Sequence, residues 1–397
     1  MKLQTTDVAK VILKPGRERP VRQYHPWIFS GAVATIDNYQ QPGQLADVYS
    51  TQNEFLARGY VNEHSQIICR LLTFKPVPID TDFFAARMDQ AIQSRQQELN
   101  DFANAFRIIN SEGDFLPGLV VDRYDRGLVC QFLTAGMEQQ RATILAILQE
   151  KLCPGFIYER SDVSARQEEG LPMVNRLLAG SLPEELIIRE HDLCFKIDVA
   201  GGQKTGFFLD QRDNRQLLLA YATDRKVCDC FSYSGGFALQ AARGGARSVT
   251  VVEQSKLALE LVQENFRLNQ LTAVPLVTVA ADVFQFLRTT DQNFDVIILD
   301  PPSLARNRGS VQKAARGYKD LHLYAFKHLA PQGLLFTFAC SQLIDHKLFQ
   351  QIVFSAASNA GRDIQLLRRL SHSSDHPVSI FHPEGDYLKG MLLRVVC

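Results

Sequence analysis

The chain has 397 residues, 46% of them hydrophobic, and this length predicts two or three domains because it exceeds what one core usually supports. Lys and Arg total 43 and Asp and Glu total 43, which excludes a global basic field and leaves only a local patch for nucleic acid. The eight cysteines include no CxxC pair, and no signal peptide or membrane span is evident, so we expect reduced thiols, no metal site and a cytoplasmic protein.

Residues 1–75 are predicted to form a small β domain, with strands at 8–13, 45–48, 55–61 and 67–74. Six of its nine Lys and Arg residues precede residue 23 and lie close to aromatic side chains. Such a mixture suits phosphate contact and base stacking. The candidate RNA contacts are Lys14, Arg17, Arg19, Arg22, His25 and Trp27. The alternative is a solvated loop with Trp27 in the core, since large amphipathic aromatics are usually buried.

A central α+β domain is predicted over residues 76–193, after a boundary at Pro76 and Pro78. A helix over 81–101 places Phe83, Phe84 and Met88 on one stripe. The expected strands are 106–110, 118–124, 127–133 and 157–160, with a second helix over 138–152. Turn residues within 180–193 predict a β-hairpin. The third domain is predicted over residues 194–397.

A polar, glycine-rich loop over residues 201–215 leads into the third domain. Loops of this composition between a strand and a helix often line a ligand. The candidate cofactor contacts here are Lys204, Phe208 and Arg212. The alternative is a helix start capped by Asp210 or Asp213, and the two interpretations are compatible.

The stretch over residues 227–253 organises the third domain as strand, glycine turn, helix and second strand. Gly235 and Gly236 allow the backbone to approach a ligand closely. Glu253 ends the second strand, where such folds place an acid on ribose hydroxyls. The glycines lack GxGxxG spacing, and Asp229 would repel phosphates, so S-adenosylmethionine (SAM) is favoured over a dinucleotide. The candidate contacts in this stretch are Asp229, Phe231, Ser234, Gly235, Gly236 and Glu253.

Strands and helices continue to alternate after residue 253, which predicts a doubly wound parallel sheet. Expected helices cover 255–270, 283–289, 316–329 and 345–360, and expected strands cover 276–280, 295–299, 333–340, 364–370 and 388–396. In the first of these helices, Leu257, Leu261, Phe266 and Leu268 are predicted to face inward. Acids end successive strands at Asp229, Glu253, Asp282 and Asp300, all on the edge where such sheets bind ligands.

Asp300 opens the segment Asp-Pro-Pro-Ser, whose two prolines fix a rigid turn beside the expected donor pocket. Asp-Pro-Pro at this place looks like the motif of SAM-dependent nucleic-acid methyltransferases that take a flipped-out base. Cys340 ends the next strand and is a candidate nucleophile. Its alternative role is that of a small buried hydrophobic residue.

Eight segments together resemble the RlmI family of 23S ribosomal RNA 5-methylcytosine methyltransferases. They are residues 25–32, 116–124, 158–162, 204–215, 230–239, 299–303, 316–321 and 338–341. The resemblance implies an N-terminal β-barrel PUA domain, a central αβ domain and a C-terminal Rossmann-like α/β class I methyltransferase domain with SAM as cofactor. The family usually has Lys after the two prolines, whereas this chain has Ser303, which bears on substrate identity.

The resemblance also implies that a Cys340 thiolate adds to cytosine C6 while Asp300 contacts the N3 and N4 edge. The implied partner is 23S ribosomal RNA, either naked or in a pre-ribosomal particle, with no membrane, and a homodimer stays open. Two rival functions stay open as well. One is methylation of another base such as guanine, which needs no thiol, and the other is a catalytically silent RNA-binding homologue.

Overall fold

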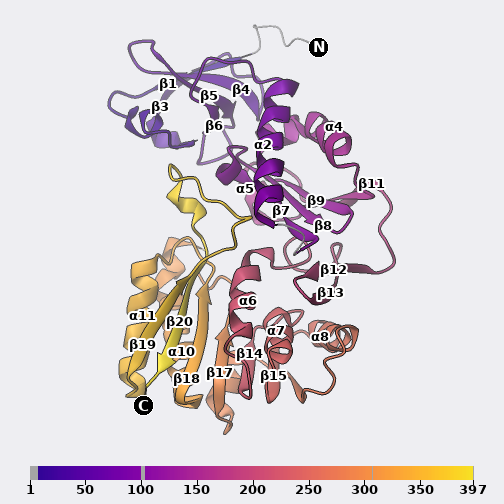
Figure 1. Cartoon of the computed structure of the whole chain (residues 1–397). Coiled ribbons are helices and arrows are strands. Elements are labelled where there is room, and N and C mark those ends of the chain that lie inside the picture. Colours follow the sequence, from indigo (N-terminus) through magenta and orange to yellow (C-terminus); the bar gives the residue numbers. More distant parts are fainter. Residues whose placement is uncertain (1–7, 100–102, 306, 397) are drawn as a thin grey trace. The chain divides into compact units, whose positions relative to one another are not determined.

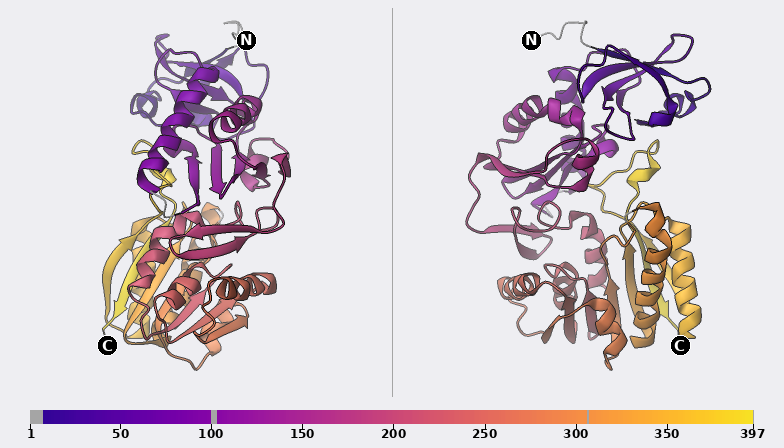
Figure 2. Two further views of the ribbon diagram at one scale, coloured as in Figure 1. Left: turned by 45° about the vertical axis from the view of Figure 1, so that its right-hand side comes forward. Right: turned by 180° about the vertical axis from the view of Figure 1, so that it is seen from behind.

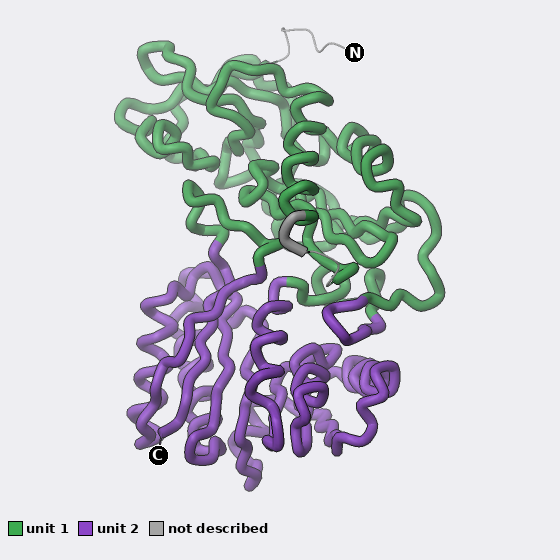
Figure 3. Tube along the Cα trace, in the orientation of Figure 1, with its two compact units in different colours: residues 1–188, 197–209, 374–385 green, residues 189–196, 210–373, 386–397 purple. Residues whose placement is uncertain are grey.

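The computed structural model describes residues 8–99, 103–305 and 307–396, which form two compact units (Figure 1 and Figure 3). Unit 1 comprises Met1–Ile188, Ile197–Leu209 and Ser374–Gly385, and unit 2 comprises Arg189–Lys196, Asp210–Ser373 and Asp386–Cys397. The domain boundaries expected after residues 75 and 193 stay predictions. Among the described residues, no helix is long and apolar enough to cross a membrane.

The first sheet of unit 1 has the strand order β2-β6-β5-β4-β1-β3. Its elements are β1 (Ala9–Leu13), α1 (Arg19–Arg22), β2 (Trp27–Ile28), β3 (Val33–Asp37), β4 (Gln44–Tyr49), β5 (Phe55–Val61) and β6 (Cys69–Thr73). In β1 and β4 buried residues alternate with partly exposed ones, which is the period of a half-buried strand. All four predicted strands are confirmed, whereas the short β2, β3 and α1 were not predicted.

The second sheet of unit 1 has the order β11-β10-β9-β8-β7. Its strands are β7 (Ala105–Asn110), β8 (Leu119–Tyr124), β9 (Gly127–Phe132), β10 (Phe156–Ser161) and β11 (Val174–Gly180). Its helices are α2 (Thr81–Leu99), η2 (Ser111–Asp114), α3 (Ala135–Gln139), α4 (Arg141–Leu152) and α5 (Ser164–Glu168). The expected helix over 138–152 is two helices, because Thr134 caps α3 and Gln140 separates it from α4. The expected end of α2 at residue 101 lies outside the described residues.

The first sheet of unit 1 has a hydrophobic cluster of its own and also contributes to the cluster of the second sheet. Tyr60 and Leu72 of the first sheet belong to the same buried cluster as Val121 of β8 and Ile144 of α4. The Tyr60 hydroxyl donates to the carbonyl of Pro117 over 2.5 Å. Removing residues 1–75 would therefore open this core as well as remove the basic segment.

A hairpin of β12 (Leu186–Glu190) and β13 (Leu193–Ile197) leads to the seven-stranded sheet of unit 2. That sheet has the order β16-β15-β14-β17-β18-β20-β19, and only β20 runs antiparallel to its neighbours (Figure 2). Its strands are β14 (Lys226–Cys230), β15 (Ser248–Glu253), β16 (Leu276–Ala280), β17 (Phe294–Leu299), β18 (Leu329–Ala339), β19 (Ile364–Leu370) and β20 (Lys389–Val395). Its helices are α6 (Arg212–Leu219), α7 (Gly236–Arg243), α8 (Lys256–Leu268), α9 (Val283–Thr289), α10 (Val311–His328) and α11 (His346–Ala360).

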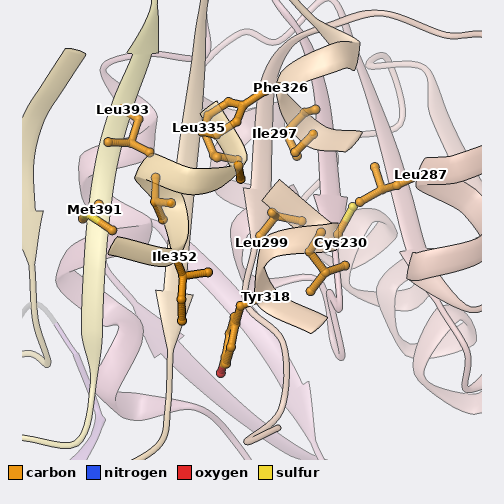
Figure 4. Packing of buried hydrophobic residues seen from close by; sticks show 14 of the residues in the cluster. Cys230, Leu287, Ile297, Leu299, Tyr318, Phe326, Leu335, Ile352, Met391 and Leu393 are labelled. Atoms are coloured by element: carbon orange, nitrogen blue, oxygen red, sulfur yellow. The ribbon is translucent and has the colours of Figure 1, made fainter. Parts of the chain in front are cut away.

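This arrangement confirms the doubly wound, Rossmann-like α/β fold. The chain runs outward from β14 through β15 to β16, then returns to the other side of β14 with β17. Open α/β sheets bind ligands at such a switch point, outside the carboxyl ends of the strands. Figure 4 shows the buried side chains between the sheet and its helices, including Leu299, Tyr318 and Ile352.

Two sequence expectations in unit 2 are corrected. The buried face of α8 contains Leu259, Val262 and Phe266, whereas Leu257 is 77% exposed and Leu268 is 40% exposed. The apolar residues of this helix are numerous enough to outline two stripes, and packing on the sheet selects one. Helix α10 begins at Val311 rather than near 316 and directly continues the 3-10 helix η4 (Arg308–Ser310), which Asn307 and Ser310 start with a capping box.

Candidate active site

Three acids and a cysteine meet at the carboxyl edge of the unit 2 sheet. Asp229 lies in β14 opposite Ile298 of β17, Glu253 ends β15, and Asp300 follows β17 directly. Cys340 follows β18, which lies parallel to β17. Parallel pairing places these strand ends along one edge, although the residues are up to 111 positions apart in the sequence. Open α/β sheets form their ligand-binding crevice at this edge.

The turn between β14 and α7 supplies the floor of this crevice. Gly235 has a φ of 82°, a left-handed conformation that favours glycine, and it forms the N-cap of α7. A Cβ on Gly236 would stand 2.8 Å from the Cδ atom of Arg215, so only glycine fits there without displacing that side chain. Asn265 of α8 donates to the Ser234 carbonyl over 3.1 Å and holds the turn in place.

Asp229 is a buried carboxyl group with one uncompensated oxygen. Its Oδ2 accepts from the backbone N–H of Ala238 over 3.0 Å, whereas its Oδ1 has no hydrogen-bond partner among the described residues. Burial raises the pKa of Asp229 to about 8, although the Ala238 N–H acts in the opposite direction. The charges of Asp300 and Glu253 raise it further. The site therefore favours a cationic group beside Asp229.

Glu253 is held by the backbone on both sides of its carboxylate. Its Oε2 accepts from the N–H of Tyr233 over 3.2 Å, and its Oε1 accepts from the N–H of Ser255 over 3.0 Å. Each oxygen keeps a further lone pair for a ligand hydroxyl. Asp282 has a structural task, because it caps α9 by accepting from the N–H of Gln285 over 2.9 Å.

Asp300 connects the cysteine with a pair of amide side chains. The Cys340 thiol donates to Asp300 Oδ1 over 3.7 Å, and Gln211 Nε2 donates to Asp300 Oδ2 over 3.0 Å. Asn214 in turn donates to Gln211 Oε1 over 2.7 Å and fixes its orientation. Cys340 is partly exposed, in contrast to Cys228 and Cys230 of β14, which are buried.

Tyr318 and Lys389 were not predicted as site residues. Burial raises the pKa of the Tyr318 phenol, and the charges of Cys340 and Asp300 raise it further, so this hydroxyl stays protonated and is a hydrogen-bond donor. Lys389 is 2% exposed and donates to the carbonyls of Ser341 over 2.5 Å and Tyr387 over 2.9 Å. Burial lowers the pKa of Lys389, and the charge of Cys340 is among those acting in the opposite direction.

The predicted loop over 201–215 is divided between the two units. Lys204 and Phe208 belong to unit 1, where the ammonium lies 4.4 Å from the ring centre. Arg212 belongs to unit 2, is almost fully buried and pairs with Asp213 over 3.4 Å. The N-cap of α6 is Gln211 without a side-chain cap bond, so the expectation that Asp210 or Asp213 caps this helix is wrong. Asp210 instead accepts from the Tyr387 hydroxyl over 2.7 Å.

The basic side chains proposed as RNA contacts in unit 1 differ in whether they form hydrogen bonds or ion pairs within the protein. Arg17 and Arg19 are exposed and make no side-chain hydrogen bond or ion pair with any residue in the described ranges. Arg22 forms a two-bond pair with Glu54 over 2.9 Å and 2.5 Å, and both side chains are about half exposed. Lys14 donates to a backbone carbonyl over 3.1 Å.

His25 and Trp27 lie in a partly buried cluster of unit 1. Trp27 Nε1 donates to Glu112 Oε1 over 2.8 Å, and its ring centre is 4.3 Å from that of His382. His25 pairs with Glu384 over 3.3 Å. Both residues are thus committed to contacts within the unit, and their role as RNA contacts stays a prediction.

Comparison with protein families gives two matches. Residues 11–74 match the model of a PUA-like domain, and residues 165–380, more than half of the chain, match that of an S-adenosylmethionine-dependent methyltransferase. Ribosomal RNA large subunit methyltransferase I of Shewanella amazonensis is 44% identical over 97% of this chain and 99% of its own. The protein of that name from Tolumonas auensis is 42% identical over 97% of this chain and 99% of its own.

Two solved structures share the fold over nearly the whole length. One is a protein assigned as a SAM-dependent methyltransferase from Streptococcus mutans, with a TM-score of 0.84, 23% identity, and coverage of 97% of this chain and 100% of its own. The other, assigned as a methyltransferase, is a complex with S-adenosylhomocysteine (SAH). Its TM-score is 0.85 at 24% identity, with coverage of 97% and 100%. These likenesses confirm the fold class expected from the sequence.

Proposed function

Because the chain belongs to the ribosomal RNA large subunit methyltransferase I family, we propose that it methylates C5 of a cytosine in 23S ribosomal RNA in the cytoplasm. SAM is its cofactor, and the relatives support SAM-dependent methylation of ribosomal RNA. One observation carries the finer assignment to cytosine C5. The Cys340 thiol lies 3.7 Å from Asp300 Oδ1 at the ends of neighbouring strands. A guanine methyltransferase would have no use for this thiol.

The residues of the crevice fit SAM. Asp229 offers the buried, uncompensated Oδ1 that a cationic donor would neutralise. Gly235 and Gly236 shape the turn by packing against Val262 and Arg215, and the backbone of this turn would contact the cofactor. Glu253 would accept from ribose hydroxyls. Asp282, which lies between β16 and α9, would lie near the adenine. When bound, SAM supplies the methyl group on a positively charged sulfur.

The same geometry gives Asp300 two tasks in the proposed reaction. It accepts the proton of the Cys340 thiol along the hydrogen bond already present, and the resulting thiolate adds to cytosine C6. Asp300 then delivers this proton to N3, so the electrons displaced by the new C–S bond collect at C5, which becomes nucleophilic. After methylation a base removes the C5 proton, the sulfur leaves as thiolate, and N3 returns its proton through Asp300 to that thiolate. The net change in the base is one methyl group gained and one proton lost.

Neighbouring side chains keep these two groups in place. Gln211, itself fixed by Asn214, holds the Asp300 oxygen that does not face the thiol. Lys389 holds the carbonyl of Ser341, the residue after Cys340, and brings a positive charge near the sulfur. A nearby cation stabilises a thiolate. Lys389 is therefore a positioning residue in this proposal.

The decisive experiment uses a ribosomal RNA fragment that carries 5-fluorocytosine at the target position. Fluorine cannot leave C5 as a cation, so elimination stalls and the enzyme stays joined to the RNA through Cys340. Wild type should form a covalent complex only with SAM present, detected by denaturing gels and mass spectrometry. Cys340→Ala should give neither complex nor methylated product. The matched control is Cys153→Ala, an exposed cysteine of unit 1 that should leave trapping unchanged.

Two results would overturn the proposal at different levels. A Cys340→Ala enzyme that still methylates RNA would remove the thiol mechanism and favour another base such as guanine. A wild-type enzyme that binds SAM and transfers no methyl group to ribosomal RNA would instead point to a catalytically silent homologue. Mapping the methylated nucleotide in ribosomal RNA from cells with and without the protein distinguishes these outcomes independently.

A further inference from the structure

Unit 1 contains a cavity of about 310 Å³, a size at the lower end of small-molecule sites. Segments far apart in the sequence line it, and all of them belong to unit 1. Tyr24 and Lys75 come from the region of the first sheet, and Arg87 comes from α2. Phe115 follows η2, and Phe381 lies in the segment over residues 374–385.

Aromatic rings are presented openly at this cavity. Tyr24 is 51% exposed, Phe381 is 44% exposed and Phe115 is 41% exposed, although large aromatic side chains are usually well buried. The ring of Tyr24 lies 5.3 Å from that of Phe381, measured between ring centres. Tyr24 and Phe115 both have positive φ angles, of 64° and 58°, which are uncommon for bulky residues. All three rings are thus accessible to a ligand at this cavity.

Arg87 contributes a positive charge that the unit does not neutralise. Its guanidinium lies 5.2 Å from the ring centre of Phe115 and 5.5 Å from that of Phe83. Burial lowers the pKa of Arg87, and its side chain makes no hydrogen bond or ion pair within the described ranges. Glu112, an acid that lines the cavity, is engaged by Trp27 Nε1 over 2.8 Å and by the Ser111 hydroxyl over 2.5 Å. Lys75 adds a second, exposed cation.

We propose that this cavity binds one unpaired nucleotide of the RNA substrate, with its base against the rings of Tyr24 and Phe381 and its phosphate at Arg87 and Lys75. Stackable rings beside available cations are the combination that single-stranded nucleic acid requires. The inference rests on the proposed action on ribosomal RNA, and it adds a contact that the PUA-like match does not assign.

The test uses the intrinsic fluorescence of Trp27, the only tryptophan, whose indole contacts the cavity-lining Glu112. The full-length enzyme is titrated with an unstructured RNA hexamer of uridines and with an abasic hexamer that has the same phosphates. We expect wild type to bind the uridine hexamer more tightly. Phe381→Ala should weaken that binding about 5- to 150-fold, the range for loss of one stacked base. Ile380→Ala is the matched control, because Ile380 is 87% exposed and lies outside the cavity lining.

Arg87→Gln tests the phosphate contact. It should weaken binding and reduce the slope of log affinity against log salt by about 0.7, the value for one phosphate contact on a single strand. Arg126→Gln, at an exposed arginine outside the cavity, should change neither quantity. SAM affinity should stay at the wild-type value in all four variants. With ribosomal RNA as substrate, Phe381→Ala should raise KM and leave kcat unchanged, since Phe381 belongs to unit 1 and the reacting groups Cys340 and Asp300 belong to unit 2.

Several outcomes would overturn the assignment. Equal affinity for the uridine and abasic hexamers would show that no base is bound. Equal affinity of each variant and its control would show that RNA does not bind at the cavity. An acidic peptide that binds with the same variant sensitivity while RNA does not would make the cavity a protein-binding site. In each case wild-type methylation of ribosomal RNA would continue. Failure of the proposed function is separate, because it appears as absent methyl transfer by the wild type.

Discussion

Replacing Asp229 with Asn should stabilise the protein in the absence of SAM. Asn has the shape of the protonated acid, and burial raises the pKa of Asp229 from 3.8 to about 8. At pH 7 the unfolded wild type gains from an ionised Asp229, whereas the folded protein keeps the group mostly protonated. The difference of about 3 pH units between 3.8 and 7, at 1.36 kcal/mol each, corresponds to about 4 kcal/mol in the free energy of unfolding.

The sign of the pH dependence follows from the same values. Between about pH 4 and pH 8 the folded state binds more protons at Asp229 than the unfolded state. The contribution of Asp229 to wild-type stability therefore falls as the pH rises through this window and is constant above it. The amide side chain of the Asp229→Asn variant has no such titration. Its stability advantage should thus be about 4 kcal/mol at pH 7 and should vanish near pH 4.

The affinity of the wild type for SAM should rise with pH, whereas its stability falls. A cationic ligand requires ionised Asp229, so wild-type affinity should fall about tenfold for each pH unit below 8. The Asn variant should show a flat profile there and bind about 10- to 150-fold more weakly at pH 8, the range for a lost charge-assisted hydrogen bond.

Chemical unfolding at pH 4.5, 6 and 7.5, with calorimetric SAM titrations at pH 6, 7 and 8, measures both effects on Asp229→Asn and wild type. The matched control is Asp291→Asn, at an exposed acid outside the site. A stability difference that is the same at every pH would refute the reasoning about the buried acid. Unchanged SAM affinity would refute the placement of the donor beside Asp229.

The remaining predictions concern two other side chains of the crevice. Glu253→Ala should weaken SAM binding about 10- to 150-fold, measured by calorimetry, because a charge-assisted contact to the ribose is lost. An affinity within twofold of wild type would contradict that assignment. Lys389→Met should lower kcat and shift the alkylation of Cys340 by iodoacetamide to higher pH, since a cation near the sulfur is lost. If the alkylation profile matches that of Lys226→Met, an exposed lysine of β14, then Lys389 only supports the fold.

Much of the unit 2 fold follows from periodicity. The predicted α9 over 283–289 and the strand over 276–280 agree with the structure residue for residue. The errors arise where local pattern is ambiguous. Leu257 and Leu268 are apolar residues that α8 exposes, and only packing against the sheet decides between its two stripes. The break between α3 and α4 at Gln140 is not marked by a Gly or Pro within residues 138–152, so the sequence does not reveal it.

The site residues at strand ends could be predicted from the sequence. Residues that reach the site from distant segments could not. Asp300 and Cys340 could be paired because parallel strands finish on one edge. Gln211 lies 89 residues before Asp300, and no local pattern indicates that its amide reaches that carboxylate. The cavity of unit 1 is a stronger case, since Phe381 belongs to a segment that is separated from Tyr24 by almost the whole chain.

Asp229 and Lys389 are charged residues in otherwise hydrophobic, buried strands, and this interruption of the hydrophobic pattern indicates the site. The central strand β14 is buried along its last four residues, and an acid there opposes the hydrophobic run that a strand covered on both faces requires. Lys389 likewise opens the largely apolar and buried strand β20. Neither charge favours folding, because burial disfavours the charged form: it raises the pKa of Asp229 and lowers the pKa of Lys389. Both residues nevertheless reach the one crevice in which Cys340 meets Asp300. The charge in a buried strand therefore identifies Lys389, which the strand-end acids alone miss, and supports Asp229, which they include.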